Sequence, residues 1–76
     1  MARLPVVDYR RVDRALRQTG FAAVRQKGSH VFYRHPDGRT TTVPHHKDRD
    51  IAPPLLRAIV EDVRMSPDEF LRLLRS

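Results

Sequence analysis

All four histidines of this 76-residue chain lie within seventeen consecutive positions, close to most of its positive charge. The histidines are His30, His35, His45 and His46. Residues 25–49 also carry six Lys and Arg against two Asp, which is +4 of the formal net charge of +6. Imidazole, with an ordinary pKa of about 6.5, takes up and releases protons near neutral pH. This segment can therefore combine proton transfer with binding of a polyanion, of which nucleic acid is the commonest.

The first candidate cluster is Lys27-Gly28-Ser29-His30. Its glycine lets the backbone approach a ligand closely, because no Cβ stands in the way. Lys27 and Ser29 offer a cation and a hydroxyl to a phosphate group, and His30 offers proton transfer. The same residues are compatible with an exposed hairpin that carries a surface histidine, and these four positions alone leave both interpretations open.

The second candidate cluster is Val43-Pro44-His45-His46-Lys47, which follows a predicted strand. Hairpin geometry brings strand ends close to neighbouring turns, so either His45 or His46 can approach the first cluster. Lys47 and Arg49 add positive charge. Taken by itself, the pattern favours an ordinary polar loop.

Other kinds of site fit the sequence poorly. The chain has no cysteine, which excludes disulfides, thiolate zinc sites and cysteine nucleophiles. Adjacent histidines rarely bind one ion together, and the sequence has neither a His-Glu-x-x-His nor a Gly-x-Ser-x-Gly motif. We therefore expect no metal site, no serine nucleophile and no cofactor.

The elements that position these clusters can be predicted from apolar spacing and turn residues. A helix is expected after Asp8, a good N-cap residue, and Gly20 should end it as the C′ residue. Its apolar stripe consists of Tyr9, Val12, Ala15 and Leu16. Strands are expected at residues 21–26, 30–35 and 39–43, joined by turns at residues 27–29 and 36–38. Such short turns make the strands an antiparallel meander.

Two more helices are expected after the loop of residues 45–50. Pro53 and Pro54 suit the first turn of a helix, where a missing N–H would be unpaired in any case. The predicted buried stripe of this helix is Leu55, Leu56, Ile59, Val60 and Val63. Ser66-Pro67-Asp68-Glu69 has the pattern of a capping box, so a short helix should follow it. Its apolar side consists of Phe70, Leu71, Leu73 and Leu74.

These elements predict one two-layer α+β domain over residues 1–76, with the helices covering one face of the sheet. Hydrophobic residues make up 39% of the chain and charged residues 32%, as in a folded rather than a disordered protein. No apolar run approaches the ~18 residues of a membrane span. The first residues also lack the features of a secretory signal, so we expect a small cytoplasmic protein with no membrane association.

Several motifs resemble the HicA-type toxins of bacterial toxin–antitoxin pairs. They are Gly20-Phe21, Arg25-Gln26-Lys27-Gly28-Ser29-His30, Pro36-Asp37-Gly38, Val43-Pro44-His45-His46 and Leu56-Arg57-Ala58-Ile59. The resemblance implies a double-stranded-RNA-binding-domain-like fold: a helix, a three-stranded antiparallel sheet and a helix, here with a short C-terminal helix. It also implies an mRNA interferase whose partners are mRNA and a HicB-like antitoxin. His30 falls on the family's catalytic histidine, and His46 on the second motif histidine.

We predict metal-independent cleavage of RNA by acid–base transesterification. His30 would deprotonate the 2′-hydroxyl, which attacks the adjacent phosphorus, and His46 would protonate the leaving 5′-oxygen. Lys27, Ser29 and Lys47 would hold the phosphate and stabilise its growing negative charge. The cations expected to line the RNA are Arg25, Lys27, Arg34, Arg39, Lys47 and Arg49.

Two other functions are compatible with the sequence. A non-catalytic RNA-binding module of the same fold would use the same basic surface without needing His30. An interaction domain with a cationic face for an acidic protein would not need RNA at all. Cleavage preference and oligomeric state stay open at this point.

Overall fold

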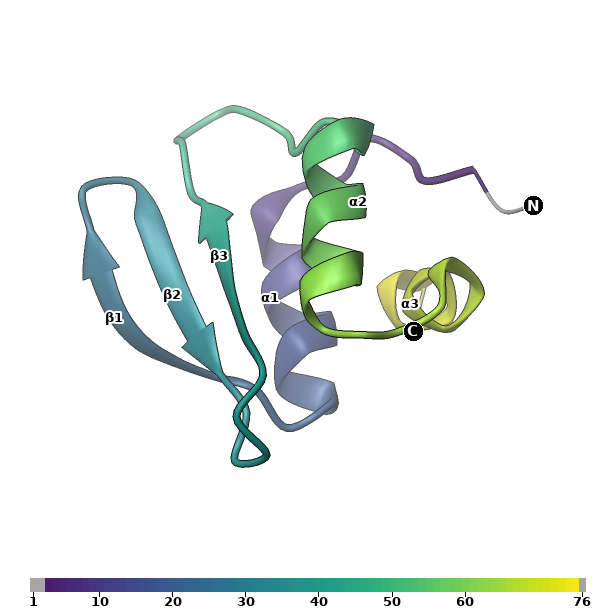
Figure 1. Ribbon diagram of the computed structural model, residues 1–76. Coiled ribbons are helices and arrows are strands. Elements are labelled where there is room, and N and C mark those ends of the chain that lie inside the picture. Colours follow the sequence, from purple (N-terminus) through teal and green to yellow (C-terminus); the bar gives the residue numbers. More distant parts are fainter. Residues whose placement is uncertain (1–2, 76) are drawn as a thin grey trace.

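The computed structural model describes residues 3–75, which form a three-stranded antiparallel sheet and helices packed on one side of it (Figure 1). In chain order the elements are α1 (Tyr9–Gln18), β1 (Ala22–Lys27), β2 (His30–Arg34), β3 (Thr40–Pro44), α2 (Pro53–Asp62) and α3 (Pro67–Arg75). The strands lie in the order β1-β2-β3. The predicted α+β fold, similar to double-stranded-RNA-binding domains, is confirmed. No helix within residues 3–75 has the length and apolar character needed to cross a membrane.

Helix α1 begins and ends close to the predicted residues, but its start lacks the predicted cap bond. Asp8 is the N-cap residue, yet its carboxylate makes no capping hydrogen bond and instead lies 3.7 Å from Nε of Arg11. At the other end, Gly20 has a φ of 98° and the N–H of Phe21 donates to the carbonyl of Leu16 over 3.0 Å. This bond and the left-handed glycine form a Schellman ending, so the chain turns sharply from α1 toward β1.

Proline and a capping box start the later helices, as predicted. Pro53 is the first residue of α2. At the start of α3, the N–H of Ser66 donates to Oε1 of Glu69 over 3.2 Å, and the N–H of Glu69 donates to Oγ of Ser66 over 3.1 Å. The prediction that Leu55 is buried is wrong: the residue is 38% exposed. The buried face of α2 follows Leu56, Ile59, Val60 and Val63. Leu55 lies about 100° around the helix from Leu56 and therefore faces away from the core.

The register of the sheet divides β2 between a covered face and an open face. Val31 and Tyr33 are buried against the helices, whereas His30, Phe32 and Arg34 alternate with them on the other side. Strand β1 is exposed along its whole length, and its pairing with β2 shifts partway along. The helices therefore cover one face of β2 and β3 only.

A polar network attaches the covered face to α1 and α2. Tyr33, 1% exposed, donates its hydroxyl to Asp13 on α1 over 2.6 Å and shares a hydrogen bond with the hydroxyl of Tyr9. Burial, followed by the bond to Asp13, raises the pKa of Tyr33 far above its ordinary value, so the phenol stays a neutral donor. Thr41 on β3, also buried, donates to Asp62 on α2 over 3.0 Å. These bonds fix the strands relative to the helices and so fix the backbone of the open face.

Candidate active site

His30 opens β2 at the end of the sheet where β1 turns into β2. The turn is made by Gly28, with a φ of 59°, and Ser29. The cross-strand neighbours of His30 are Lys27 on β1 and Pro44 on β3. The His30 residue is exposed, and within residues 3–75 its imidazole makes no hydrogen bond or ion pair. Both ring nitrogens are therefore available to a ligand.

The loop after β3 brings His46 to the same end of the sheet. The backbone N–H of His45 donates to the carbonyl of Ser29 over 2.6 Å, so the loop leaves β3 alongside the β1–β2 turn. The ring of His45 stacks flat on Tyr9 of α1, with 3.8 Å between ring centroids and 4° between planes. Nε2 of His46 lies 3.4 Å from Oγ of Ser29. His45 thus anchors the loop to α1, and His46 is the histidine placed near His30.

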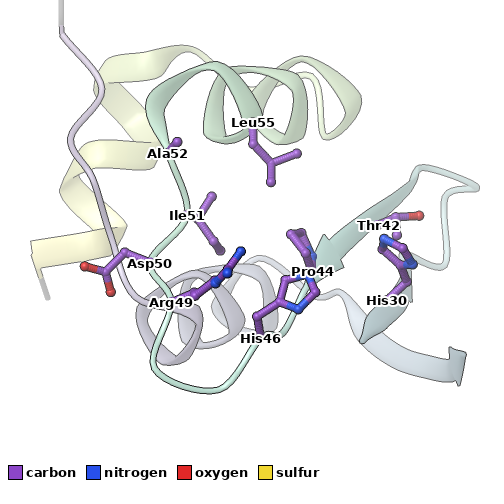
Figure 2. A pocket seen from close by; sticks show the side chains of 9 residues that line it. All are labelled: His30, Thr42, Pro44, His46, Arg49, Asp50, Ile51, Ala52 and Leu55. Atoms are coloured by element: carbon purple, nitrogen blue, oxygen red, sulfur yellow. The ribbon is translucent and has the colours of Figure 1, made fainter. Parts of the chain in front are cut away.

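His30 and His46 line one pocket of about 500 Å³ beside the end of β3 and the start of α2 (Figure 2). The pocket is lined by His30, Thr42, Pro44, His46, Arg49, Asp50, Ile51, Ala52 and Leu55. Figure 2 shows the two imidazoles and the Arg49 guanidinium at the border of this space, with Leu55 on the side of α2. The pocket therefore combines two proton-transfer groups and a cation with an apolar wall.

The ionisable side chains of this pocket are two imidazoles, one guanidinium and the Asp50 carboxylate. None of them makes an ion pair with another residue of the described chain, residues 3–75. Among the same residues, no three His, Cys, Asp or Glu side chains are grouped so as to hold a metal ion. The pocket thus presents its positive and titratable groups to an external anion such as phosphate.

The residues predicted to bind the reacting phosphate are only partly brought together. Lys27 and Ser29 flank the turn beside His30, and Arg49 lines the pocket. Lys47 does not line it and instead borders a neighbouring hollow on the other side of the loop. Arg49 is therefore better placed than Lys47 to supply the loop cation.

The predicted RNA-binding arginines lie at increasing distances from His30 along the sheet. Arg25 is on the open face of β1, where its guanidinium carbon lies 4.7 Å from the centroid of the Phe32 ring. Arg34 ends β2, opposite Thr40 of β3. Both residues are exposed, so an RNA strand that crosses the open face can reach them.

Arg39 is not brought to this group. It lies in the β2–β3 hairpin at the opposite end of the sheet, where its Nε donates to Oδ2 of Asp37 over 2.8 Å. Its Nη1 donates to the carbonyl of Val63 at the end of α2, and its guanidinium lies 5.2 Å from the Phe21 ring. These contacts attach the hairpin to the helices, so the side chain of Arg39 holds the fold together.

Five residues that line the pocket are absent from the candidates predicted from sequence: Thr42, Asp50, Ile51, Ala52 and Leu55. Phe32, which lies under Arg25, is absent from them as well. Strand alternation did carry a signal for two of them, because Phe32 shares a face with His30 and is paired with Thr42. No local pattern marks Asp50 or Leu55, since their positions depend on how the loop packs between β3 and α2.

Residues 9–65 match the sequence model of the family described as "HicA toxin of bacterial toxin-antitoxin". The matched segment runs from the first residue of α1 to the turn before α3, and it includes the whole pocket. A comparison with curated proteins finds no match. The family similarity therefore covers the segment that carries both pocket histidines.

Proposed function

This chain belongs to the HicA toxin family of bacterial toxin–antitoxin systems, and from that premise we propose that it is an mRNA interferase that cleaves RNA with His30 and His46. The observation that carries the proposal is the meeting of these two imidazoles, one from a strand and one from a loop, in a single pocket that the Arg49 guanidinium also lines. Residues 1–76 then act as one ribonuclease domain in the cytoplasm, where mRNA is found.

RNA supplies its own nucleophile, since each 2′-hydroxyl lies next to a backbone phosphorus. His30 removes the 2′ proton, and the oxygen attacks the phosphorus in line. As the bond from phosphorus to the 5′-oxygen breaks, His46 donates a proton to that oxygen. The products end in a 2′,3′-cyclic phosphate and a 5′-hydroxyl. Acid–base help of this kind is worth about 10²–10⁴ in rate.

His46 fits the role of the acid better than His45 does. The His45 ring is stacked on Tyr9, away from the pocket, whereas His46 shares the pocket with His30. Ser29, whose Oγ is 3.4 Å from Nε2 of His46, supports this role by orienting the ring. A histidine held on one side by a hydroxyl keeps its other nitrogen for the leaving oxygen.

Lys27, Ser29 and Arg49 are suited to stabilise the phosphorus as negative charge grows on its oxygens. They lie around the pocket end of the sheet, and within residues 3–75 neither Lys27 nor Arg49 forms an ion pair, so both cations can contact the RNA. Donors already in place for a developing charge need little reorganisation during the reaction. Lys47, Arg25 and Arg34 would contact the strand further from the scissile bond.

Membership of this family implies a toxin–antitoxin partner. We propose that this partner is a HicB-like protein that covers the pocket and the open face of the sheet and thereby excludes RNA. An acidic surface on the antitoxin would match the positive segment of residues 25–49.

The proposal is tested by incubating RNA with the wild-type protein and with His30→Ala in the presence of EDTA. Wild-type protein should give fragments that end in 2′,3′-cyclic phosphate, identified by mass spectrometry. His30→Ala should bind the same RNA with similar affinity and leave it intact. A 3′-hydroxyl newly formed at the cleavage site would contradict the proposed chemistry. Cleavage by His30→Ala at the wild-type rate would show that His30 is not the base. RNA that wild-type protein binds but never cuts would identify a binding module instead.

A further inference from the structure

Phe32 lies outside the hydrophobic core, although it occupies the centre of the middle strand. The core is formed by residues on the covered face of the sheet and the helices, and Phe32 is neither among them nor among the partly buried residues packed against them. Its ring faces the open side of β2, between His30 and Arg34. Phe32 is partly buried on this face, so some of its surface stays accessible to a ligand.

The immediate contact of Phe32 is a cation. Arg25, paired with it across the β1–β2 ladder, places its guanidinium carbon 4.7 Å from the ring centroid. Arg25 is exposed, so its side chain lies over the ring and can also be reached from solvent. Guanidinium planes and aromatic rings are the surfaces on which proteins stack unpaired nucleic-acid bases. We name this pair, Arg25 and Phe32, the stacking platform.

The surroundings of the stacking platform are suited to a polyanion. The strands β1, β2 and β3 contain no Asp or Glu. The polar side chains that share the open face with Phe32 are those of Arg25, Lys27, His30, Arg34, Thr40 and Thr42. Cations and hydroxyls around an aromatic ring bind the backbone of a strand while the ring receives a base.

We propose that the stacking platform holds one unpaired base next to the scissile phosphate, so that the substrate of this protein is single-stranded RNA. His30 and Phe32 share a face of β2 two residues apart, a separation of about 7 Å that one nucleotide can span. With the phosphate beside His30, the base of a neighbouring nucleotide reaches Arg25 and Phe32. This inference rests on the proposed ribonuclease function and adds the strandedness of the RNA to it.

A duplex does not satisfy this geometry. Paired bases are stacked on each other inside the helix, and a duplex offers a flat protein surface only phosphates and 2′-hydroxyls. A duplex can therefore bind the cations of the open face but cannot use the stacking platform. An acidic protein is a different occupant of the same face, and it would not depend on an aromatic ring at position 32.

The test combines a change in the protein with a change in the RNA. A single-stranded oligonucleotide with one cleavage site, identified first with wild-type protein, is prepared with an abasic nucleotide on either side of that site. Loss of the stacked base should lower kcat/KM of the wild-type protein by about 5- to 100-fold at one of the two positions. Phe32→Leu and Arg25→Gln should both have a lower kcat/KM than wild type on the intact RNA. For these variants, the abasic nucleotide should lower kcat/KM little further. Val24→Ala, an exposed neighbour outside the platform, should respond to the abasic RNA as wild type does.

The same comparison made by binding keeps this inference separate from the proposed function. Affinity is measured with His30→Ala protein and uncleavable 2′-O-methyl RNA. The abasic nucleotide should weaken binding to His30→Ala by the same factor, and it should have little effect on binding to the double variant Phe32→Leu/His30→Ala. Both results are expected whether or not the protein is a nuclease. If the abasic nucleotide weakened binding equally in wild type and in both platform variants, base stacking on the platform would be contradicted. The proposed ribonuclease activity would be unaffected. Equal cleavage of single-stranded and paired RNA of one sequence would overturn the proposed substrate. RNA affinity that neither platform variant changes would assign the ring to a protein partner instead.

Phe32→Leu is expected to fold, because the ring lies outside the core. Thermal unfolding by circular dichroism checks this for each variant. Arg25→Gln changes an exposed side chain and keeps the test decisive if the leucine variant is unstable.

Discussion

The two ends of the sheet are built from similar residues and behave differently. The pocket end has a glycine with positive φ, His30 and uncommitted cations. The hairpin end also has a glycine with positive φ, Gly38, together with His35 and Arg39. There, Nδ1 of His35 accepts a hydrogen bond from the backbone N–H of Asp37 over 3.1 Å, and the His35 and Phe21 rings form a T-shaped pair with 5.2 Å between centroids. His35 is partly buried and bonded, whereas His30 is exposed and unbonded within residues 3–75.

The difference between the ends is the position of one carboxylate. Asp37 lies inside the hairpin turn and accepts bonds from the backbone N–H and the Nε of Arg39. The positive groups of that end are thereby used within the fold. At the pocket end Asp50 lines the pocket without forming an ion pair with Arg49, so the guanidinium is left for a ligand. Similar residue types at the two ends are therefore used differently within residues 3–75: Asp37 pairs with Arg39 at the hairpin end, whereas His30 makes no hydrogen bond or ion pair at the pocket end.

Alanine substitution of one histidine at each end should give the largest contrast. His30→Ala should lower the cleavage rate by about 10²–10⁴-fold, because the base is lost. Its melting temperature should stay near that of wild type, since the ring is exposed. His35→Ala should do the reverse, keeping the rate and losing about 1 kcal/mol of stability with the contact to Phe21. Rates and thermal melts of the two variants, measured together, check this. Equal rate losses in both would erase the distinction between the ends.

The second contrast separates the two histidines within the pocket. His46→Ala should lower cleavage of ordinary RNA by about 10²-fold, since the leaving 5′-oxygen is no longer protonated. In a substrate whose bridging 5′-oxygen is replaced by sulfur, the leaving group is a thiolate, which departs without needing a proton. That substrate should restore His46→Ala to nearly the wild-type rate and should not restore His30→Ala. Restoration of both variants, or of neither, would contradict the assignment of acid and base.

The fold was largely predictable because several local signals agree. Gly20 at a helix end, Pro53 at a helix start and the capping box at Ser66 each specify a boundary by a backbone requirement, and the structure has these boundaries. The misses are side-chain choices with small energy differences. The exposed carboxylate of Asp8 pairs with Arg11 instead of capping, and Leu55 lies at the margin of its apolar stripe.

The site was predictable in its residue types and less so in its partners. The local pattern pointed to a histidine after the first turn and another after Pro44, and both line the pocket. Which of His45 and His46 faces the pocket was open, because the answer depends on Tyr9, which is distant in sequence. From the sequence, Arg39 was also predicted to be one of the cations that line the RNA. A charge count cannot show that its guanidinium is bonded to a turn and to the end of a helix.

The cations of the two ends provide a third, smaller contrast. RNA affinity should fall as salt rises, and removal of one phosphate contact should reduce the slope of log affinity against log salt by about 0.7 for a single strand. Lys27→Ala and Arg49→Ala should each show this reduction with little change in stability. Arg39→Ala should keep the full slope and lose about 1–2 kcal/mol of stability, since the Val63 carbonyl loses its charged donor. Filter binding at several salt concentrations, together with thermal melts, measures both quantities. A reduced slope in Arg39→Ala would return this residue to the RNA-binding surface.

The smallest effect tests the carboxylate that distinguishes the hairpin end. The backbone N–H of Arg39, and then its side chain, lower the pKa of Asp37 below its ordinary value. A carboxyl whose pKa is lower in the folded state stabilises the fold above its unfolded pKa, and this contribution is lost as pH falls through the folded value. Asp37→Asn should therefore melt at a slightly lower temperature than wild type at pH 7, and the two curves should converge as the pH falls below the ordinary Asp pKa of about 3.9. Glu69, whose pKa the capping box lowers, is present in both proteins and cancels. Parallel melting curves across this range would show that the charge of Asp37 does not hold the hairpin, and the contrast between the ends would then need another cause.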